Sequence, residues 1–224
     1  MMFCNRLARP GVSWTCRQAR RPTARVEKET RMIETKTTKR DLRSLIVYCS
    51  STGNTRKVAT TIKEILENEK VNATLLEVKD AAGEELYNYD LVFLGSPSLT
   101  FLPAEPMMRF IEDKLTVHRK RGDIKPSAPQ IAGKNAVVFV TYSGPHTGIN
   151  EAITAGKYMG QFLEHIGFGL PAEWYVIGEY HNNLELSTKG RLGDVRGRPN
   201  QQDLDNVRND VQTLLARIIH EGAD

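Results

Sequence analysis

The chain has 224 residues, of which 40% are hydrophobic and 26% are charged, a composition typical of a globular protein in water. No apolar run approaches the roughly 18 residues that a membrane-spanning helix needs, which excludes a transmembrane protein. The three cysteines lack the spacing of metal ligands, and so low and odd a number argues against a disulfide framework and indicates a reducing, cytoplasmic location.

The net charge of +4 originates at one end of the chain. Residues 1–40 contain 11 of the 31 Lys and Arg residues and 3 of the 27 acidic residues, which leaves the remainder at −4. We therefore infer no nucleic-acid binding from the basic balance. Residues 1–41 are a disordered basic tail, a transit segment, or a stretch before an unused start codon, in which case Met32 begins the protein.

Strands and helices alternate along residues 42–222, which we predict to be one domain. Continuous apolar runs indicate buried strands, and apolar residues at helical spacing indicate helices. In chain order the pattern predicts a strand at 42–49, a polar loop at 50–55, a helix at 55–68, a strand at 73–78, a loop or short helix at 80–88, a strand at 91–95, a loop at 96–104, a helix at 105–117, a connection at 118–134, a strand at 136–140, a loop at 143–150, a helix at 151–166, a strand at 174–177, an irregular stretch at 178–199 and a helix at 201–220.

Five apolar strands that alternate with helices predict an α/β fold, a three-layer sandwich whose parallel sheet is covered by helices on both faces. The common order for five such strands is 2-1-3-4-5. This order brings the loops that follow strands 1, 3 and 4 together at the carboxyl edge of the sheet, where ligands bind in such folds.

The polar loop between the first strand and the first helix is the strongest functional signal. A helix N-terminus presents unpaired amides and the positive end of its dipole, and this loop adds hydroxyl and amide donors. No Lys stands where a Walker-type loop has one, so the loop suits a single phosphate monoester. The alternative is a polar turn capped by Ser and Thr, with no ligand. The loop consists of Ser50, Ser51, Thr52, Gly53, Asn54 and Thr55.

The Ser-x-Thr-Gly-Asn-Thr run in this position resembles the FMN phosphate loop of flavodoxins, and the chain resembles a flavodoxin-like FMN-binding protein from about residue 43 to 220. The resemblance implies that residues 50–55 bind the FMN 5′-phosphate and that the next two loops enclose the flavin ring. The ring-binding residues implied are Ser96, Pro97, Ser98, Leu99 and Phe101 in one loop, and Tyr142, Ser143, Gly144, His146 and Gly148 in the other. Neither a metal ion nor a catalytic residue is implied.

The resemblance favours an electron carrier that serves redox partner proteins or a small-molecule acceptor. Two departures keep an alternative open: residues beyond the basic segment carry a net charge of only −4, and the ring-binding loops contain no Trp. The alternative is an FMN-dependent NAD(P)H or quinone oxidoreductase of the same fold, and a flavin-free binding module is a third possibility. The stretch 178–199 is long enough to cover the flavin, bind a partner or form an oligomer contact.

Overall fold

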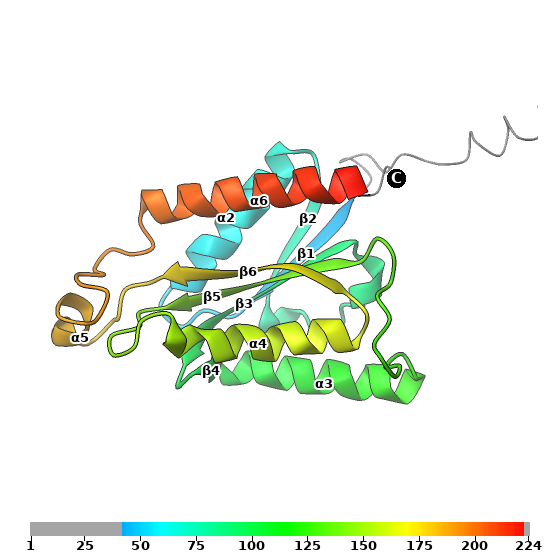
Figure 1. Ribbon diagram of the computed structural model, residues 1–224, viewed down its shortest axis with the longest axis horizontal. Helices are drawn as coiled ribbons and strands as arrows, with labels where there is room; N and C mark the ends of the chain where they lie inside the picture. The colour runs from blue at the N-terminus through cyan, green and yellow to red at the C-terminus, as the bar shows by residue number, and fades with distance from the viewer. Residues whose placement is uncertain (1–41, 222–224) are drawn as a thin grey trace, which may run out of the picture. The chain divides into compact units, whose positions relative to one another are not determined.

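The structure, a computed structural model, describes residues 42–221, so the predictions for residues 1–41 and for residue 222 lie outside it. Helices cover both faces of a central sheet (Figure 1). The strands are β1 (Arg43–Tyr48), β2 (Asn72–Glu77), β3 (Leu91–Leu99), β4 (Leu102–Pro103), β5 (Asn135–Tyr142) and β6 (Gly169–Ile177). The helices are α2 (Asn54–Asn68), η2 (Val78–Asp80), η3 (Leu86–Asn88), α3 (Glu105–Arg121), α4 (Asn150–His165), α5 (Leu184–Thr188) and α6 (Gln201–Glu221). None of these helices combines the length and apolarity needed to cross a membrane.

The sheet has the order β2-β1-β3-β5-β6, and every pair along this path is parallel. These are the five predicted strands, so the predicted order is confirmed. The sixth strand, β4, was not predicted; it pairs antiparallel with the end of β3. Residues 96–104, predicted as a loop, therefore form a short hairpin that extends the sheet beyond the carboxyl ends of its neighbours.

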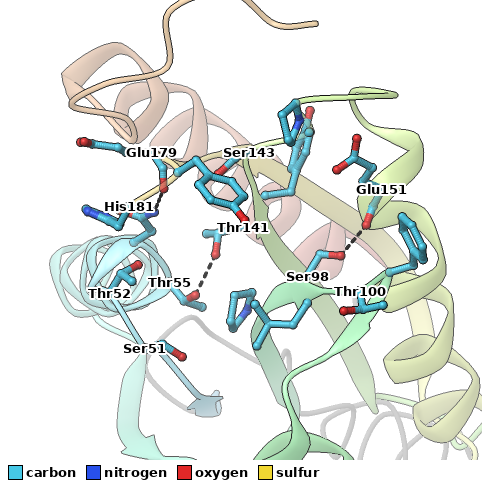
Figure 2. Close-up of a pocket in the computed structure, with 18 of the residues that line it drawn as sticks. Ser51, Thr52, Thr55, Ser98, Thr100, Thr141, Ser143, Glu151, Glu179 and His181 are labelled. Atoms are coloured by element: carbon cyan, nitrogen blue, oxygen red, sulfur yellow. Dashed lines mark hydrogen bonds between the residues drawn. The ribbon is translucent and has the colours of Figure 1, made fainter. Parts of the chain in front are cut away.

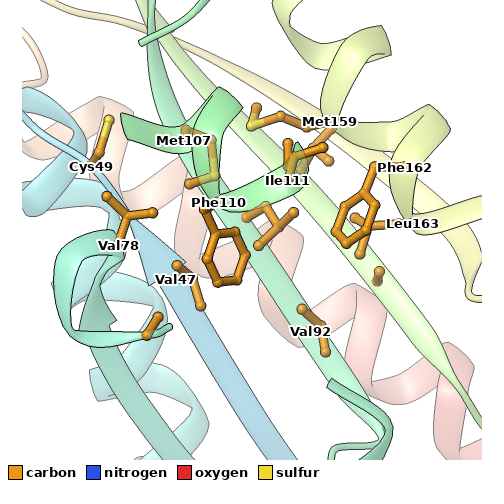
Figure 3. Close-up of a cluster of buried hydrophobic side chains, with 14 of the residues drawn as sticks. Val47, Cys49, Val78, Val92, Met107, Phe110, Ile111, Met159, Phe162 and Leu163 are labelled. Atoms are coloured by element: carbon orange, nitrogen blue, oxygen red, sulfur yellow. The ribbon is translucent and has the colours of Figure 1, made fainter. Parts of the chain in front are cut away.

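Two hydrophobic clusters hold the three layers together. Along β1, Leu45 and Val47 belong to a cluster with residues of α3 and α4, whereas Ile46 and Tyr48 belong to a cluster with residues of α2 and α6. Successive side chains of a strand point to opposite faces, so a strand that is buried on both faces must be apolar throughout. Figure 3 shows the first cluster, in which Met107, Phe110 and Ile111 of α3 are drawn with Met159, Phe162 and Leu163 of α4.

Several element boundaries differ from the prediction: β3 continues to Leu99, β5 spans Asn135–Tyr142, and larger differences concern α3, β6 and the stretch 178–199. α3 continues to Arg121 because basic residues near a helix C-terminus are favoured by its dipole, and it ends where Gly122 takes a φ of 73°. β6 begins at Gly169 and includes Pro171, which a strand with one neighbour tolerates; the β5–β6 register shifts between Asn135 and Val137. The stretch 178–199, predicted to be irregular, contains the short helix α5.

Candidate functional site

The polar loop between β1 and α2 has its predicted position at the carboxyl edge of the sheet. Gly53 takes the N-cap position of α2 with a φ of 97°, a left-handed conformation that glycine adopts at little cost. The Ser50 hydroxyl accepts hydrogen bonds from the amides of Gly53 and Arg56, each at 3.2 Å. Ser50 therefore fixes the shape of the loop and satisfies one amide of the first turn of α2.

The other donors of this loop remain available to a ligand. Gly53 has no side chain to cap α2, and within residues 42–221 the amides of Asn54 and Thr55 have no hydrogen-bond acceptor. Ser51 and Thr52 are exposed on the loop, so their hydroxyls are accessible. The Thr55 hydroxyl lies 2.8 Å from the hydroxyl of Thr141 at the end of β5, which joins the loop to the neighbouring wall. This group of neutral donors at a helix N-terminus suits an anion.

A cavity of about 500 Å³ opens at the carboxyl ends of β1, β3 and β5 (Figure 2). It brings the three predicted loops together and adds a fourth segment after β6. The predicted residues that line it are Ser51, Thr52, Asn54, Thr55, Pro97, Ser98, Leu99, Phe101, Tyr142, Ser143, Gly144 and His146. The sequence analysis did not select the lining residues Thr100, Thr141, Glu151, Glu179, Tyr180, His181 and Asn182.

The predicted residues that do not line this cavity are Ser50, Gly53, Ser96 and Gly148. Ser96 is completely buried, and its hydroxyl accepts from the Ala104 amide at 2.9 Å and lies 3.7 Å from the Cys49 sulfur. Burial raises the pKa of the Cys49 thiol, so the sulfur stays protonated at neutral pH and is a poor nucleophile. Gly148 donates its amide to the Gly144 carbonyl at 3.0 Å. These residues support the walls of the cavity from behind.

The hairpin between β3 and β4 forms one rim of the cavity. Its two turn residues, Thr100 and Phe101, have φ values of 50° and 71°, the signs of a type I′ turn, which normally contains Asn and Gly. A β-branched Thr in this conformation is strained. Leu99 and Phe101 are 50% and 54% exposed, so the turn presents large apolar side chains at the cavity mouth.

Replacing Thr100 with asparagine should relieve part of this strain. We expect Thr100→Asn to raise the free energy of unfolding by about 0.5–1 kcal/mol, because Asn tolerates the left-handed region better than a β-branched residue. Urea denaturation of the two proteins measures the change. The control is Thr154→Asn on the exposed face of α4, where the same replacement relieves no strain and should not stabilise. A destabilised Thr100→Asn protein would show that the threonine side chain makes a compensating contact.

The loop after β5 is held in shape by its own backbone and by Glu151 of α4. Gly144 has a φ of 51°, and a Cβ at this position would lie 2.6 Å from the carbonyl oxygen of Gly148. The Glu151 carboxylate accepts from the amides of His146 and Thr147 at 2.8 and 2.6 Å. The Glu151 carbonyl accepts from the Ser98 hydroxyl on the opposite rim, a contact drawn in Figure 2. The loop is thus fixed to both α4 and β3.

Residues 179–182, which follow β6, form the fourth wall of the cavity. The sequence analysis did not assign them to the site, although the length of the stretch 178–199 was the one signal that pointed to it. Asn54 donates from its side chain to the Glu179 carbonyl at 3.1 Å, and the Ser143 hydroxyl donates to the Gly178 carbonyl at 2.8 Å. A Cβ at Gly178 would lie 2.7 Å from the Asn54 amide nitrogen. The segment after β6 therefore lies directly against the first turn of α2.

The residues of this cavity fit a flavin nucleotide. The volume falls in the range of small-molecule sites, about 300–1,000 Å³. One end supplies hydroxyls and the amides of Asn54 and Thr55, which suit a phosphate. The other end supplies Pro97, Leu99 and Phe101, which suit the faces of a flat, largely apolar ring.

Comparison with known proteins gives a family match for one segment, about a quarter of the chain. Residues 45–99 match the flavodoxin domain family. Over 54 residues, the chain is 44% identical to the flavodoxin-like domain-containing protein BilS of Clostridioides difficile and 43% identical to a flavodoxin of Maridesulfovibrio salexigens. These matches cover 24% of this chain, and they span only 30% and 37% of the two relatives.

Longer but weaker similarities extend beyond this region. The chain is 28% identical over 169 residues to an NAD(P)H dehydrogenase (quinone) of Archaeoglobus fulgidus, a match that covers 62% of this chain and 83% of the relative. Among solved structures, a flavodoxin from the domain Archaea superposes with a TM-score of 0.54 at 17% identity, over 79% of this chain and 99% of that one. Flavodoxin 2 from Bacillus cereus superposes with a TM-score of 0.55 at 20% identity, over 78% and 99%.

The structural similarities, at these low identities, establish the fold. The family match covers β1, the polar loop, α2, β2 and β3, and within it the polar loop and the end of β3 line the cavity. Residues 42–221 thus have the fold of flavodoxins, and residues 45–99, which include the polar loop, match the flavodoxin domain family.

Proposed function

We propose that this chain binds FMN in the cavity and carries electrons between redox partners. The observation that carries the proposal is the convergence of three separate loops, with lining residues within 51–55, 97–101 and 141–146, on one cavity with a polar and an apolar end. When bound, FMN supplies the transfer of one or two electrons. The protein's residues bind the cofactor, orient it and control access to it.

At the polar end, the loop 50–55 would hold the 5′-phosphate. The amides of Asn54 and Thr55 and the hydroxyls of Ser51 and Thr52 are donors at the positive end of the α2 dipole. Arg56 is engaged elsewhere, because its guanidinium lies 2.5 Å from the Glu77 carboxylate. Binding at this end would therefore depend on neutral donors.

At the other end, the rims at residues 97–101 and 142–146 would enclose the flavin ring. Tyr142 is buried and Phe101 is half exposed, so one wall is fixed and the other reaches solvent. An electron carrier needs one edge of its cofactor close to the surface. The exposed apolar residues Leu99 and Phe101 would meet the partner there, since apolar and aromatic side chains contribute most to the centre of a docking surface.

The loop after β5 should be intolerant of a side chain at Gly144. We expect Gly144→Ala to lower FMN affinity about tenfold or more, because the new Cβ would displace the loop that encloses the ring. Quenching of flavin fluorescence measures the affinity. The matched control is Gly133→Ala, which has a similar φ of 75° but open space around the new Cβ. Equal losses in both variants would mean that the loop after β5 does not bind the ring.

An FMN-dependent NAD(P)H or quinone oxidoreductase is the second candidate. It is favoured by the similarity to the Archaeoglobus fulgidus NAD(P)H dehydrogenase (quinone), which covers more of this chain than the other two relatives do. The fourth wall at residues 179–182 also favours it, since a reductase needs an enclosed space for its substrate beside the ring.

The absorption spectrum of the purified protein tests the proposal. Flavin absorption, with a cofactor that is released by heat and identified as FMN, would support it; a colourless protein that takes up no added FMN would overturn it. Anaerobic reduction then separates the two candidates. Reduction in two separate one-electron steps without oxidation of NADPH would support the carrier. Rapid reduction by NADPH with turnover of a quinone would support the oxidoreductase.

A further inference from the structure

We infer that the Glu151 carboxylate lowers the reduction potential of bound FMN, because it places a negative charge in the wall of the cavity. This inference rests on the proposed FMN site and adds a residue of α4 that tunes it. Its consequence is direction: with this charge in place, the reduced protein would be a stronger electron donor toward its redox partner.

Glu151 lies where both rims of the cavity meet α4. It lines the cavity itself and stands in the first turn of the helix. Its carbonyl accepts a hydrogen bond from the Ser98 hydroxyl on the hairpin rim, the contact drawn in Figure 2. Its side chain reaches the other rim, the loop after β5. The residue is therefore held against the two rims that would enclose the flavin ring.

One oxygen of the carboxylate fixes the loop after β5. Oε1 accepts from the amides of His146 and Thr147 at 2.8 and 2.6 Å, and it lies 3.4 Å from the Thr147 hydroxyl. Because His146 lines the cavity, these bonds keep the charge next to residues that would border the ring. Amide donors are dipoles, which hold a carboxylate in place without cancelling its charge.

The charges around the cavity do not offset that of Glu151. Within residues 42–221, Glu151 forms no salt bridge, and the side chains that line the cavity include neither Lys nor Arg. The other carboxylate of the lining, Glu179, accepts from the Gly197 amide at 2.8 Å and points away from the cavity in Figure 2. Glu151 is thus the carboxylate whose charge would act on the ring.

Reduction makes a flavin ring more negative. Uptake of two electrons and one proton from a reductant adds one negative charge to the ring. A fixed carboxylate beside the ring opposes this change, since like charges repel strongly in a cavity that is partly shielded from water. The protein would then bind reduced FMN more weakly than oxidised FMN. By thermodynamic linkage, this difference in affinity is a lowered reduction potential.

Glu151→Gln tests the inference, because it removes the charge and keeps a carbonyl oxygen that can accept from the two loop amides. The quantity to compare is the dissociation constant of reduced FMN divided by that of oxidised FMN, each measured by anaerobic titration of the flavin-free full-length protein. We expect Glu151→Gln to lower this ratio about tenfold, which equals a rise of about 30 mV in the two-electron midpoint potential. Redox titration of the FMN-loaded protein against a reference dye measures that potential independently.

The matched control is Glu164→Gln, which removes a charge from the exposed far end of the same helix and should leave the ratio unchanged. Glu151→Ala should change the ratio as Glu151→Gln does. It should also weaken the binding of FMN in both oxidation states, since the loop after β5 loses its acceptor. The two substitutions at Glu151 therefore separate the charge from the hydrogen bonds.

An unchanged ratio in Glu151→Gln would overturn the inference, as would an equal change in Glu164→Gln. A changed ratio in Glu151→Ala but not in Glu151→Gln would also overturn it, because the position of the loop, and not the charge, would then set the potential. If the unaltered protein binds no FMN, the proposed function itself fails. That outcome is distinct from a site that binds FMN and is indifferent to the charge of Glu151.

Discussion

Thr52→Glu should weaken FMN binding by about 100-fold while leaving riboflavin binding almost unchanged. Thr52 is exposed on the loop that would hold the phosphate, so the larger side chain fits without disturbing the fold. A carboxylate about 5 Å from one phosphate charge costs about 3 kcal/mol at an effective dielectric constant of about 20, which corresponds to a factor of about 100 in affinity. Fluorescence titration of the flavin-free protein with each flavin measures both values.

Thr52→Gln is the matched control for this prediction, since it has nearly the same size and no charge. We expect it to reduce FMN affinity by less than about threefold, the loss of one weak hydroxyl contact. If the glutamate variant binds FMN as the glutamine variant does, the phosphate does not lie on the loop 50–55. A parallel loss for riboflavin would instead indicate that the substitution distorts the whole cavity.

The second large effect is expected at Gly95, in the centre of the sheet. Gly95 of β3 is paired with Phe139 of β5, and a Cβ at Gly95 would lie 2.0 Å from the end of the Phe139 ring. Phe139 is completely buried and cannot move aside. We therefore expect Gly95→Ala to lower the free energy of unfolding by about 2–3 kcal/mol, a typical cost of overpacking a core. Urea denaturation measures it.

A double-mutant cycle separates this clash from a general effect of adding alanine. Phe139→Leu should recover at least half of the stability lost in Gly95→Ala, because the shorter side chain leaves space for the new methyl group. The control is Gly83→Ala, where a Cβ meets no atom within 4 Å and the change should be within about 0.5 kcal/mol. Additive effects of the Gly95 and Phe139 substitutions would contradict the proposed contact.

The central part of the fold could be predicted because local and long-range signals agree there. The run Leu45–Tyr48 is apolar on both faces, as β1 requires, and the polar loop and the helical stripe of α2 follow directly. Once five such strands alternate with helices, few orders are compatible with right-handed crossovers. The order of the sheet and the meeting of the three loops at one edge therefore followed from pattern alone.

The hairpin and the start of β6 could not be predicted because their residues carry opposing signals. Thr100 and Phe101 do not favour a type I′ turn, and the two flanking prolines indicate a loop, so only pairing with β3 fixes β4. Gly169 to Ala172 lack a strand pattern, and these residues are extended because β5 offers them a free edge. In both cases tertiary pairing overrides local preference.

The site was predictable to the extent that it lies on loops next to apolar strands. Ser96 was selected for its position after a strand, but whether it faces the cavity or the interior depends on the register of β3, and it is buried. His181 and its neighbours were not selected, because their place beside α2 depends on the hydrogen bond between Asn54 and Glu179, residues far apart in the sequence. Such a contact leaves no trace in local composition.

The strained turn at Thr100 and Phe101 has a consequence for laboratory evolution of this protein. Selection for heat resistance alone would enrich Asn and Gly at these two positions, because both residues adopt positive φ readily. Selection for retention of a flavin would oppose the change at Phe101, whose aromatic ring borders the cavity. The two selections would therefore favour different residues at position 101. The residue recovered there would show whether heat resistance or flavin retention was the stronger constraint.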